Sequence, residues 1–340
     1  MTTQTDSNKK QNVLVTGGAG FIGSHLCERL LKDGKQVICV DNFITSHPRN
    51  IEALMPNPHF AFLRLDVNQS FDLETLKELE RFQIPFHGIQ EIYHLACPTS
   101  IRKFDQYKIQ TLLSNSLGNY QVLEIATKYR SKILLSSSSV VYGSRGKDRL
   151  IFREDDRGIV DHLTPRACYD EGRRFSETMF ETYRQVYGLD IKIARIFRTY
   201  GPRMPLFDGH LIPDFVLSAI EGKDLVVYGD ASFTTSLCYI EDVMDGLLRV
   251  MKSPQTTGPV NIGSDVDVKI VDVAQKIIEL TGSSSSIVFK ESLAFLTALG
   301  LPDIHIAKEM GWLPLTRLEE GLQKTIDDIQ ANKMILTTFE

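Results

Sequence analysis

Short apolar runs alternate with longer amphipathic segments from residue 12 to residue 197. The runs at 13–15, 37–40, 60–65, 91–95, 132–136 and 191–197 have the nearly continuous hydrophobicity of strands that a parallel sheet buries on both faces. The segments between them carry apolar residues at helical spacing, most clearly at 110–129 and 169–187. Strands that alternate with helices in this way predict an α/β fold built on a doubly wound parallel sheet.

Three glycines follow the first predicted strand at the spacing G-x-x-G-x-x-G, and they are Gly17, Gly20 and Gly23. Glycine there lets the backbone turn tightly and approach a pyrophosphate, while the N-terminus of the following helix presents unpaired N–H groups to the phosphates. Asp41 ends the second predicted strand. A carboxylate at that place accepts both ribose hydroxyls and repels a 2′-phosphate, so the sequence predicts NAD rather than NADP as the cofactor. Asp66, after the third predicted strand, is a candidate adenine contact.

The composition is that of an ordinary globular protein. The 340 residues are 42% hydrophobic and 24% charged, and 38 Lys and Arg against 43 Asp and Glu give a net charge of −5. This mild acidity, with no basic block and no apolar run of membrane-spanning length, argues against nucleic acid or a membrane as a partner. The five cysteines are scattered without a Cys-x-x-Cys pair. We therefore expect reduced thiols, no metal site and a cytoplasmic protein.

The character of the sequence changes after residue 198, where TYGPRMPLFDGHLIP is rich in glycine and proline. A short element is expected at 225–228, and residues 239–251 and 260–263 are expected to return to the main sheet. We predict a Rossmann domain that binds NAD (residues 11–197 and 237–263) and a smaller C-terminal substrate-binding domain (198–236 and 264–335). A disordered polar tail at 1–10 and a short apolar helix at 292–299, ended by Gly300, complete the prediction.

A candidate proton shuttle combines a phenol, a cation and hydroxyl groups. Tyr169 and Arg173 are four residues apart in the predicted helix 169–187, so they share one face of it. A run of serines at 136–139 ends a predicted strand. Beside a nicotinamide, such a set can move the proton of an alcohol during hydride transfer, because a neighbouring cation makes a phenol a stronger acid and a serine can hold the substrate oxygen.

Longer strings of the sequence carry a resemblance to a known family. They are TGGAGFIGSHL, VDNF, YHLACP, SNSLGNYQVLEIA, SSSSVVYG, PRACYDEGRR and ARIFRTYGPRM. The chain resembles the extended short-chain dehydrogenase/reductases (the NAD-dependent epimerase/dehydratase family), and most of all the UDP-glucuronate decarboxylases. The resemblance implies that Ser138 is the catalytic hydroxyl, that Tyr169 is the base and that Arg173 stands where the family carries lysine. In that family, bound NAD oxidises the sugar C4 hydroxyl, the β-keto acid loses carbon dioxide, and the ketone is reduced again.

The same resemblance assigns the remaining site residues. For the cofactor it implies Gly17, Gly20, Phe21, Ile22, Gly23, Asp41, Asn42, Asp66, Val67, Leu95, Ala96, Asn115, Tyr169 and Arg173. For the substrate it implies Pro98, Ser139, Val140, Arg198, His210, Thr235 and Gly300.

The chain departs from the family pattern on the substrate side. Val140 replaces a glutamate and Arg198 an asparagine, while Thr235 and Gly300 stand where the family uses arginines on the UDP diphosphate. Loss of two charge-assisted contacts costs about 3–6 kcal/mol, or about 10²–10⁴ in affinity. A misplaced gap or compensating arginines would be the alternative explanation, and Arg198 could restore one contact.

We therefore expect an NAD-dependent enzyme that oxidises a secondary hydroxyl of a small molecule, with decarboxylation where a β-keto acid forms, on a substrate that has diverged from UDP-glucuronate. An ordinary UDP-glucuronate decarboxylase, a nucleotide-sugar epimerase or dehydratase, and a non-catalytic NAD-binding protein remain as alternatives. The resemblance also implies a homodimer in which helices 110–129 and 169–187 pair with their copies across a two-fold axis. The second helix offers Phe175, Met179, Tyr183 and Val186 for that contact, although some of these must face its own sheet.

Overall fold

The central element of the protein is a parallel sheet of seven strands, which confirms the predicted fold class. The computed structural model describes residues 10–146, 149–254, 258–291 and 300–338. The strand order is β12-β7-β5-β4-β1-β2-β3, and all neighbours are parallel. These strands are β1 (Asn12–Thr16), β2 (Gln36–Asp41), β3 (Phe60–Arg64), β4 (Glu91–His94), β5 (Lys132–Ser138), β7 (Ile191–Ile196) and β12 (Pro259–Ile262).

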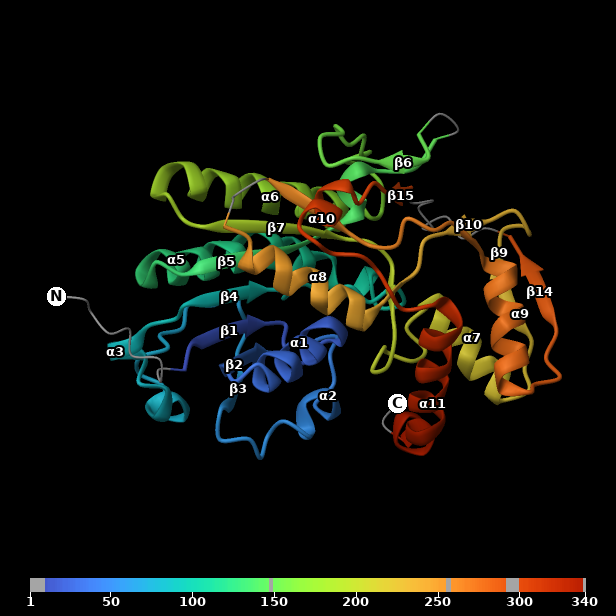
Figure 1. Cartoon of the computed structure of the whole chain (residues 1–340), viewed down its shortest axis with the longest axis horizontal. Coiled ribbons are helices and arrows are strands. Elements are labelled where there is room, and N and C mark those ends of the chain that lie inside the picture. Colours follow the sequence, from blue (N-terminus) through green and yellow to red (C-terminus); the bar gives the residue numbers. More distant parts are fainter. Residues whose placement is uncertain (1–9, 147–148, 255–257, 292–299, 339–340) are drawn as a thin grey trace.

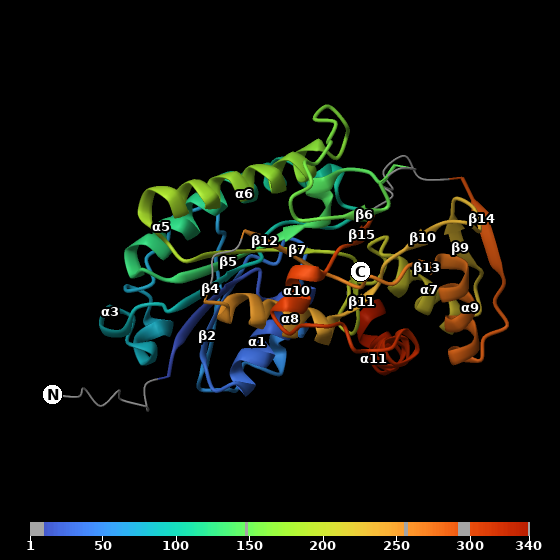
Figure 2. The same ribbon diagram turned by 45° about the horizontal axis from the view of Figure 1, so that its top comes forward.

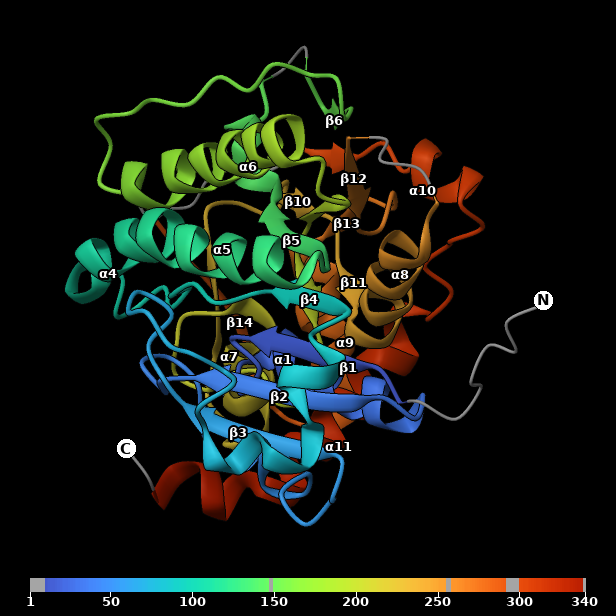
Figure 3. The same ribbon diagram turned by 90° about the vertical axis from the view of Figure 1, so that its left-hand side faces the viewer.

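Helices cover both faces of this sheet. α1 (Phe21–Lys32) and α8 (Ile240–Lys252) pack on one face, while α5 (Asn119–Tyr129) and α6 (Ala167–Tyr187) pack on the other (Figures 2 and 3). Each face has its own apolar core, because the strands are buried on both sides. Of the two segments expected to return to the sheet, β12 supplies a strand and α8 supplies a covering helix.

The helix predicted at 110–129 is interrupted, which corrects the prediction of one continuous helix. It consists of α4 (Lys108–Leu113), a π-helical turn η3 (Ser114–Gly118) and α5. In this stretch Asn115 Nδ2 donates to the Thr111 carbonyl at 2.8 Å, and Asn119 Nδ2 donates to the Asn115 carbonyl at 2.6 Å. Side chains that bond to carbonyls one turn back compete with the helical ladder and widen it. Such π-turns are frequent at functional sites.

A second group of elements lies past the carboxyl ends of the sheet strands, at the right of Figure 1. It contains α7 (Leu211–Ile220), α9 (Ile270–Thr281), α11 (Leu318–Thr338) and the parallel pair β9 (Leu225–Tyr228) and β14 (Ile287–Lys290). The boundaries predicted for the NAD-binding and substrate-binding domains remain a prediction. Short elements complete the chain: α2 (Arg49–Glu52), η1 (Lys77–Phe82), α3 (Ile84–His87), η2 (Asp105–Tyr107), η4 (Ser139–Tyr142), β6 (Ile151–Phe152), β8 (Thr199–Tyr200), β10 (Thr234–Thr235), β11 (Cys238–Tyr239), β13 (Val268–Lys269), β15 (Leu301–Pro302) and α10 (His305–Glu309).

Two predicted segments lie outside the described residues: the polar tail, apart from Lys10, and the helix at 292–299. Within the described ranges no helix is long and apolar enough to cross a membrane. The same part of the chain holds no cluster of His, Cys, Asp or Glu side chains that could bind a metal ion.

Candidate active site

The loop between β1 and α1 is shaped by its glycines. Gly17 has a φ of +71°, and a Cβ there would lie 2.7 Å from the backbone nitrogen of Ala96. A Cβ at Gly23 would lie 2.1 Å from the Gly17 carbonyl oxygen. Gly20 is the N-cap of α1, and Phe21 and Ile22 form its first turn. The backbone therefore passes close to the strand ends and exposes a helix N-terminus, which is the arrangement that binds a pyrophosphate.

Asp41 closes this loop from the end of β2. Its Oδ2 accepts a hydrogen bond from the Ala19 N–H at 3.0 Å, and its Oδ1 accepts from the Phe43 N–H at 2.9 Å and from Ser46 Oγ at 2.7 Å. A carboxylate has about four acceptor positions, so these contacts orient it and leave room for a ribose hydroxyl. The next residue, Asn42, accepts from the Ile44 N–H at 3.0 Å and shapes the turn.

The other predicted cofactor residues follow the ends of β3 and β4. Asp66 Oδ1 accepts from the Asn68 N–H at 2.9 Å, and Val67 is buried. Leu95 and Ala96 are partly buried directly after β4.

Asn115, in the π-turn, is occupied by protein contacts. Its Oδ1 accepts from Ser176 Oγ at 2.9 Å, and its amide nitrogen fills the space beside Gly172, where a Cβ would lie 2.9 Å from it. Asn115 therefore joins the π-turn to α6, the helix that carries Tyr169 and Arg173.

Tyr169 and Arg173 occupy the first turns of α6, as predicted. Arg173 Cζ lies 5.3 Å from the centre of the Tyr169 ring, and Arg173 Nη1 donates to the Ser136 carbonyl at 3.0 Å. Burial by itself would lower the pKa of Arg173, but Cys97, Tyr169 and a hydrogen bond to Tyr169 raise it above its usual value. The guanidinium thus stays charged, and its buried Nε has no partner among the described residues.

Ser138 is the last residue of β5. Its Oγ accepts from the Val140 N–H at 3.4 Å, and its Cα is paired with that of Ile196 at the end of β7. The Arg173 contact to the Ser136 carbonyl ties the end of β5 to α6. The sheet and the helix therefore bring Ser138, Tyr169 and Arg173 to one edge of the fold.

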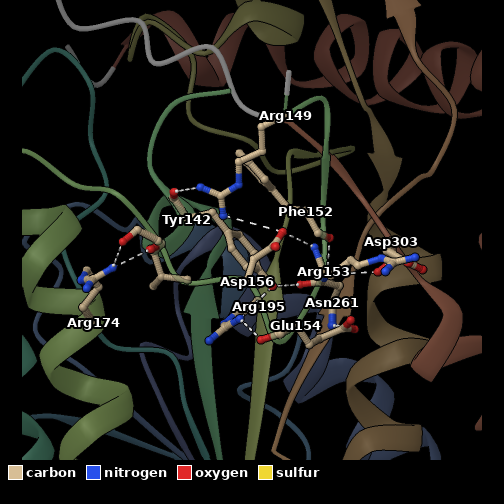
Figure 4. A network of polar contacts seen from close by, with 12 residues as sticks. Tyr142, Arg149, Phe152, Arg153, Glu154, Asp156, Arg174, Arg195, Asn261 and Asp303 are labelled. Carbon is tan, nitrogen blue, oxygen red and sulfur yellow. Dashed lines mark hydrogen bonds and ion pairs between the residues drawn. The ribbon is translucent and has the colours of Figure 1, made fainter. Parts of the chain in front are cut away.

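A network of polar side chains behind this edge was missed by the sequence analysis (Figure 4). Arg195 of β7 donates to the Tyr142 hydroxyl at 2.8 Å, and that hydroxyl donates to Asn261 Oδ1 of β12 at 2.7 Å. The Asn261 N–H donates to Glu154 at 2.9 Å. These contacts hold the turn that follows Ser138. The clue in the sequence is Arg195 itself, because a charge inside an apolar strand requires buried partners.

The predicted substrate residues are mostly buried. Pro98, Ser139, Val140 and Thr235 have little exposed surface. His210 precedes α7, and its Nε2 lies 3.3 Å from Oδ2 of Asp208.

Gly300 is enclosed. A Cβ there would lie 2.9 Å from the Leu150 carbonyl and 2.9 Å from the Phe152 ring. This packing leaves no space for the arginine that the resemblance implies at that position.

The chain matches the NAD dependent epimerase/dehydratase family over residues 13–263, and it belongs to that family. It is an NAD-dependent enzyme of the extended short-chain dehydrogenase/reductase class, which confirms the predicted family, cofactor and enzyme class.

Individual relatives narrow the comparison. UDP-glucuronic acid decarboxylase 1 of Xenopus tropicalis is 38% identical over 320 residues, which cover 93% of this chain and 72% of that protein. UDP-glucuronic acid decarboxylase 5 of Arabidopsis thaliana is 37% identical over 322 residues, with 94% and 89% covered. The solved structure of UDP-glucuronic acid 4-epimerase from Bacillus cereus, in complex with UDP-glucuronic acid and NAD, matches with a TM-score of 0.81 at 28% identity, covering 94% of this chain and 99% of that one.

The residues of this chain fit NAD. The glycine loop leaves no space for side chains at Gly17 and Gly23, and the Asp41 carboxylate is oriented at the end of β2. The Arg173 Nε is buried and has no acceptor in the described part of the chain. These groups would hold the pyrophosphate, the adenine ribose and the nicotinamide ribose, respectively.

Proposed function

We propose that the protein oxidises a secondary hydroxyl on the sugar of a nucleotide sugar. The observation that carries the proposal is the placement of a phenol and a buried guanidinium, 5.3 Å apart, on the helix bonded to the strand end that bears Ser138. Relatives with 35–38% identity are UDP-glucuronic acid decarboxylases, which supports a nucleotide sugar as the substrate. A non-catalytic role is not supported, because the chain keeps a serine, a tyrosine and a cation (Ser138, Tyr169 and Arg173) at one edge of the sheet.

The residues of the chain have distinct roles in this reaction. Bound NAD supplies the hydride acceptor for the carbon that carries the hydroxyl. Tyr169 takes the hydroxyl proton as general base, and Ser138 Oγ donates a hydrogen bond to the same substrate oxygen. Arg173 stabilises the phenolate form of Tyr169, and its Nε, which meets no acceptor in the described ranges, can donate to the nicotinamide ribose.

The substrate side of the site offers fewer polar groups than the resemblance to UDP-glucuronate decarboxylases implies, so we expect a substrate other than UDP-glucuronate. The buried Val140 offers no polar group, and the enclosed Gly300 leaves no room for an arginine without rearrangement of Leu150 and Phe152. Thr235 is buried as well. A second candidate function is UDP-glucuronate decarboxylation, which the identity of the relatives favours.

Native mass spectrometry followed by turnover assays tests the proposal. The purified protein should carry NAD, bind UDP-sugars and reduce or recycle that NAD when a hydroxyl is oxidised, while Tyr169→Phe should bind NAD and the sugar without turnover. Efficient release of carbon dioxide from micromolar UDP-glucuronate would establish the second candidate. If no UDP-sugar is bound or oxidised, the proposed substrate class is wrong.

A further inference from the structure

Glu177 lies one helical turn after Arg173 on α6, and its side chain is only 14% exposed. Its carboxylate accepts a hydrogen bond from Ser137 Oγ at 2.5 Å, whereas Arg173 Nη1 donates to the carbonyl of Ser136 at 3.0 Å. Side chains four residues apart on a helix are neighbours on one face of it. The two opposite charges therefore lie side by side, because they leave the same face of α6 and are bonded to consecutive residues of β5.

The second cation beside Glu177 is Arg195 of β7. Arg195 donates to the carboxylate from Nε at 3.0 Å and from Nη2 at 2.8 Å, and its side chain is 11% exposed. Arg173 Cζ lies 5.3 Å from the centre of the Tyr169 ring. A series of alternating charges therefore starts beside the base and continues into the sheet, with the cation Arg173, the anion Glu177 and the cation Arg195.

The members of this series act on one another strongly, because little water reaches them and the local dielectric constant is low. Burial lowers the pKa of Arg173, while Cys97, Tyr169 and Glu177 raise it. An anion next to Arg173 also offsets part of the positive charge that Arg173 presents to the phenol. Glu177 therefore bears on the base without contacting it.

We propose that Glu177 is a positioning residue for the base, which holds Arg173 beside Tyr169 and limits the positive charge that acts on the phenol. Its bonds to Ser137 and Arg195 fix the carboxylate against the sheet, so it acts through Arg173 and not on the substrate. The inference rests on the proposed function, because it takes Tyr169 as the base. It adds that the acidity of this base depends on a carboxylate two helical turns away.

Other ionisable side chains of the described residues also face this series. Those near Tyr169 and Arg173 are Arg166 and Asp170 of α6 and, at the end of β4, His94 and Cys97. Those that line a cavity together with Glu177 and Arg195 are Glu171, Arg174 and Asp156. Burial raises the pKa of Asp170 to about 6, but this carboxyl is present in every variant below, so its titration cancels in the comparison.

NMR titration of Tyr169 tests the proposal without a known substrate. The sample is the NAD-loaded protein labelled with carbon-13 at the ζ carbon of tyrosine, and the Tyr169 signal is the one missing from Tyr169→Phe. In Glu177→Gln the phenol should ionise at a pH about 0.5–1 unit lower than in the wild type, because a nearby anion is gone. In Arg195→Met it should ionise at a higher pH, because Glu177 loses the cation that offsets its charge.

Glu181→Gln is the matched control. It removes the same charge from the same helix one turn further on, where the carboxylate is 39% exposed and binds Arg184 Nε at 2.7 Å. The Tyr169 midpoint should not move in this variant. Glu177→Asp keeps the charge, so it should keep the wild-type midpoint even though its shorter side chain lowers turnover.

The direction of the shifts decides between a positioning role and a purely structural one. Equal midpoints in Glu177→Gln and the wild type would overturn the proposal, and so would shifts in the same direction in Glu177→Gln and Arg195→Met. A shift in Glu181→Gln as large as that in Glu177→Gln would overturn it as well. Should Glu177→Gln fail to fold, Arg195→Met decides, because a purely structural role predicts no shift there.

The titration also separates this inference from the proposed function. If the midpoints move as expected but no UDP-sugar is oxidised, the positioning role stands and the proposed substrate class is wrong. If a UDP-sugar is oxidised but the midpoints coincide, the proposed function stands and the positioning role is wrong. With an oxidised UDP-sugar, the acidic limb of kcat against pH should move with the midpoint while KM stays unchanged, and a fixed limb would overturn the positioning role.

Discussion

Two guanidinium groups lie near the phenol ring of Tyr169, with Arg166 Cζ at 5.6 Å and Arg173 Cζ at 5.3 Å from the ring centre. The two cations differ in their partners. Arg173 is anchored by the Ser136 carbonyl, whereas the Arg166 Nε lies 3.8 Å from the Asp170 carboxylate. One cation is therefore anchored beside the Tyr169 ring, and the other is held by a longer ion pair.

The fixed cation leads to a prediction about the chemistry. Tyr169→Phe should lower turnover by at least about 10²–10⁴-fold while NAD binding survives, because the hydroxyl is needed only for proton transfer. Arg173→Lys should retain substantial activity. Arg173→Ala should move the pH optimum upward, because the phenolate loses a stabilising charge and forms only at higher pH. Turnover measured against pH checks all three variants, and full activity of Tyr169→Phe would contradict the mechanism.

The carboxylate of Asp41 leads to a prediction about the cofactor. The protein should bind NAD(H) well and NADP(H) poorly, since a 2′-phosphate would face the oriented carboxylate. Asp41→Ala should narrow this difference by weakening NAD binding and admitting the phosphate. Calorimetry with both cofactors is the measurement, and equal affinities in the wild type would remove the role assigned to Asp41.

At the scale of elements, α6 is bonded to the sheet at two successive turns. Arg173 donates to the carbonyl of Ser136, and one turn later Glu177 accepts from Ser137 Oγ at 2.5 Å. Glu177 also binds Arg195 of β7, at 3.0 Å to Nε and 2.8 Å to Nη2. Helix and strands are therefore held in one register, which fixes the helix that carries Tyr169 relative to the strand that ends at Ser138.

This buried ion pair predicts a large and non-additive effect on stability. Glu177→Gln should lower the free energy of unfolding by about 3–5 kcal/mol, because it leaves the Arg195 charge buried without its partner. Combining it with Arg195→Met should restore part of that loss, because the uncompensated charge is gone. Urea unfolding of the two single variants and the double variant gives the coupling energy. Simple additivity would show that the pair does not act as a unit.

His94, at the end of β4, gives a prediction about stability in acid. His94 is buried between Thr16 Oγ1, at 2.7 Å from Nδ1, and Asn119 Oδ1, at 2.9 Å from Nε2, and burial lowers its pKa to about 4. Between pH 6.5 and 4 the unfolded chain binds a proton that the folded chain does not, so stability falls as the pH falls through this window. The loss due to His94 should be about 2 kcal/mol at pH 5. Urea unfolding at pH 7.5 and pH 5 should show a smaller difference in His94→Gln, and an equal difference would refute the assignment.

At the scale of the whole molecule, exposed apolar side chains gather on the helices that cover one face of the sheet. Ile109 of α4 is 65% exposed, Leu117 of the π-turn 47%, and Phe175 and Val186 of α6 51% and 67%. α4 and α5 lie beside α6, so these side chains belong to one helical layer (Figure 3). Met179 and Tyr183, which were also predicted to face a partner, pack partly against their own core. This layer supports the proposed homodimer, since an exposed apolar patch of this kind marks an interface.

The dimer is tested by sedimentation at micromolar concentration. The wild type should sediment as a dimer, and Leu117→Arg should shift it toward the monomer, because a charge would enter the apolar layer. Leu315→Arg is the control, since Leu315 is 79% exposed and lies just before α11. A wild-type protein that is only monomeric would contradict the proposal.

Much of this protein follows from the sequence alone. Near-continuous apolar runs identify strands of a sheet that is covered on both faces, and glycines between a strand and a helix mark the dinucleotide loop, because both patterns reflect local requirements of the backbone. The pairing of Tyr169 with Arg173 follows from helical spacing in the same way. Their assignment to catalysis remains a prediction.

Other features depend on contacts between distant segments, and only the tertiary structure decided them. The π-turn at Asn115 arises where its side chain meets Ser176 on α6, and the Gly300 packing arises from Leu150 and Phe152, about 150 residues earlier in the chain. The network of Arg195, Tyr142 and Asn261 was equally invisible in the sequence, because its members come from separate strands and turns. Backbone preferences and hydrophobic patterns involve residues that are close in the sequence, so they can be recognised there. Buried polar partners and steric contacts involve residues that only the folded chain brings together.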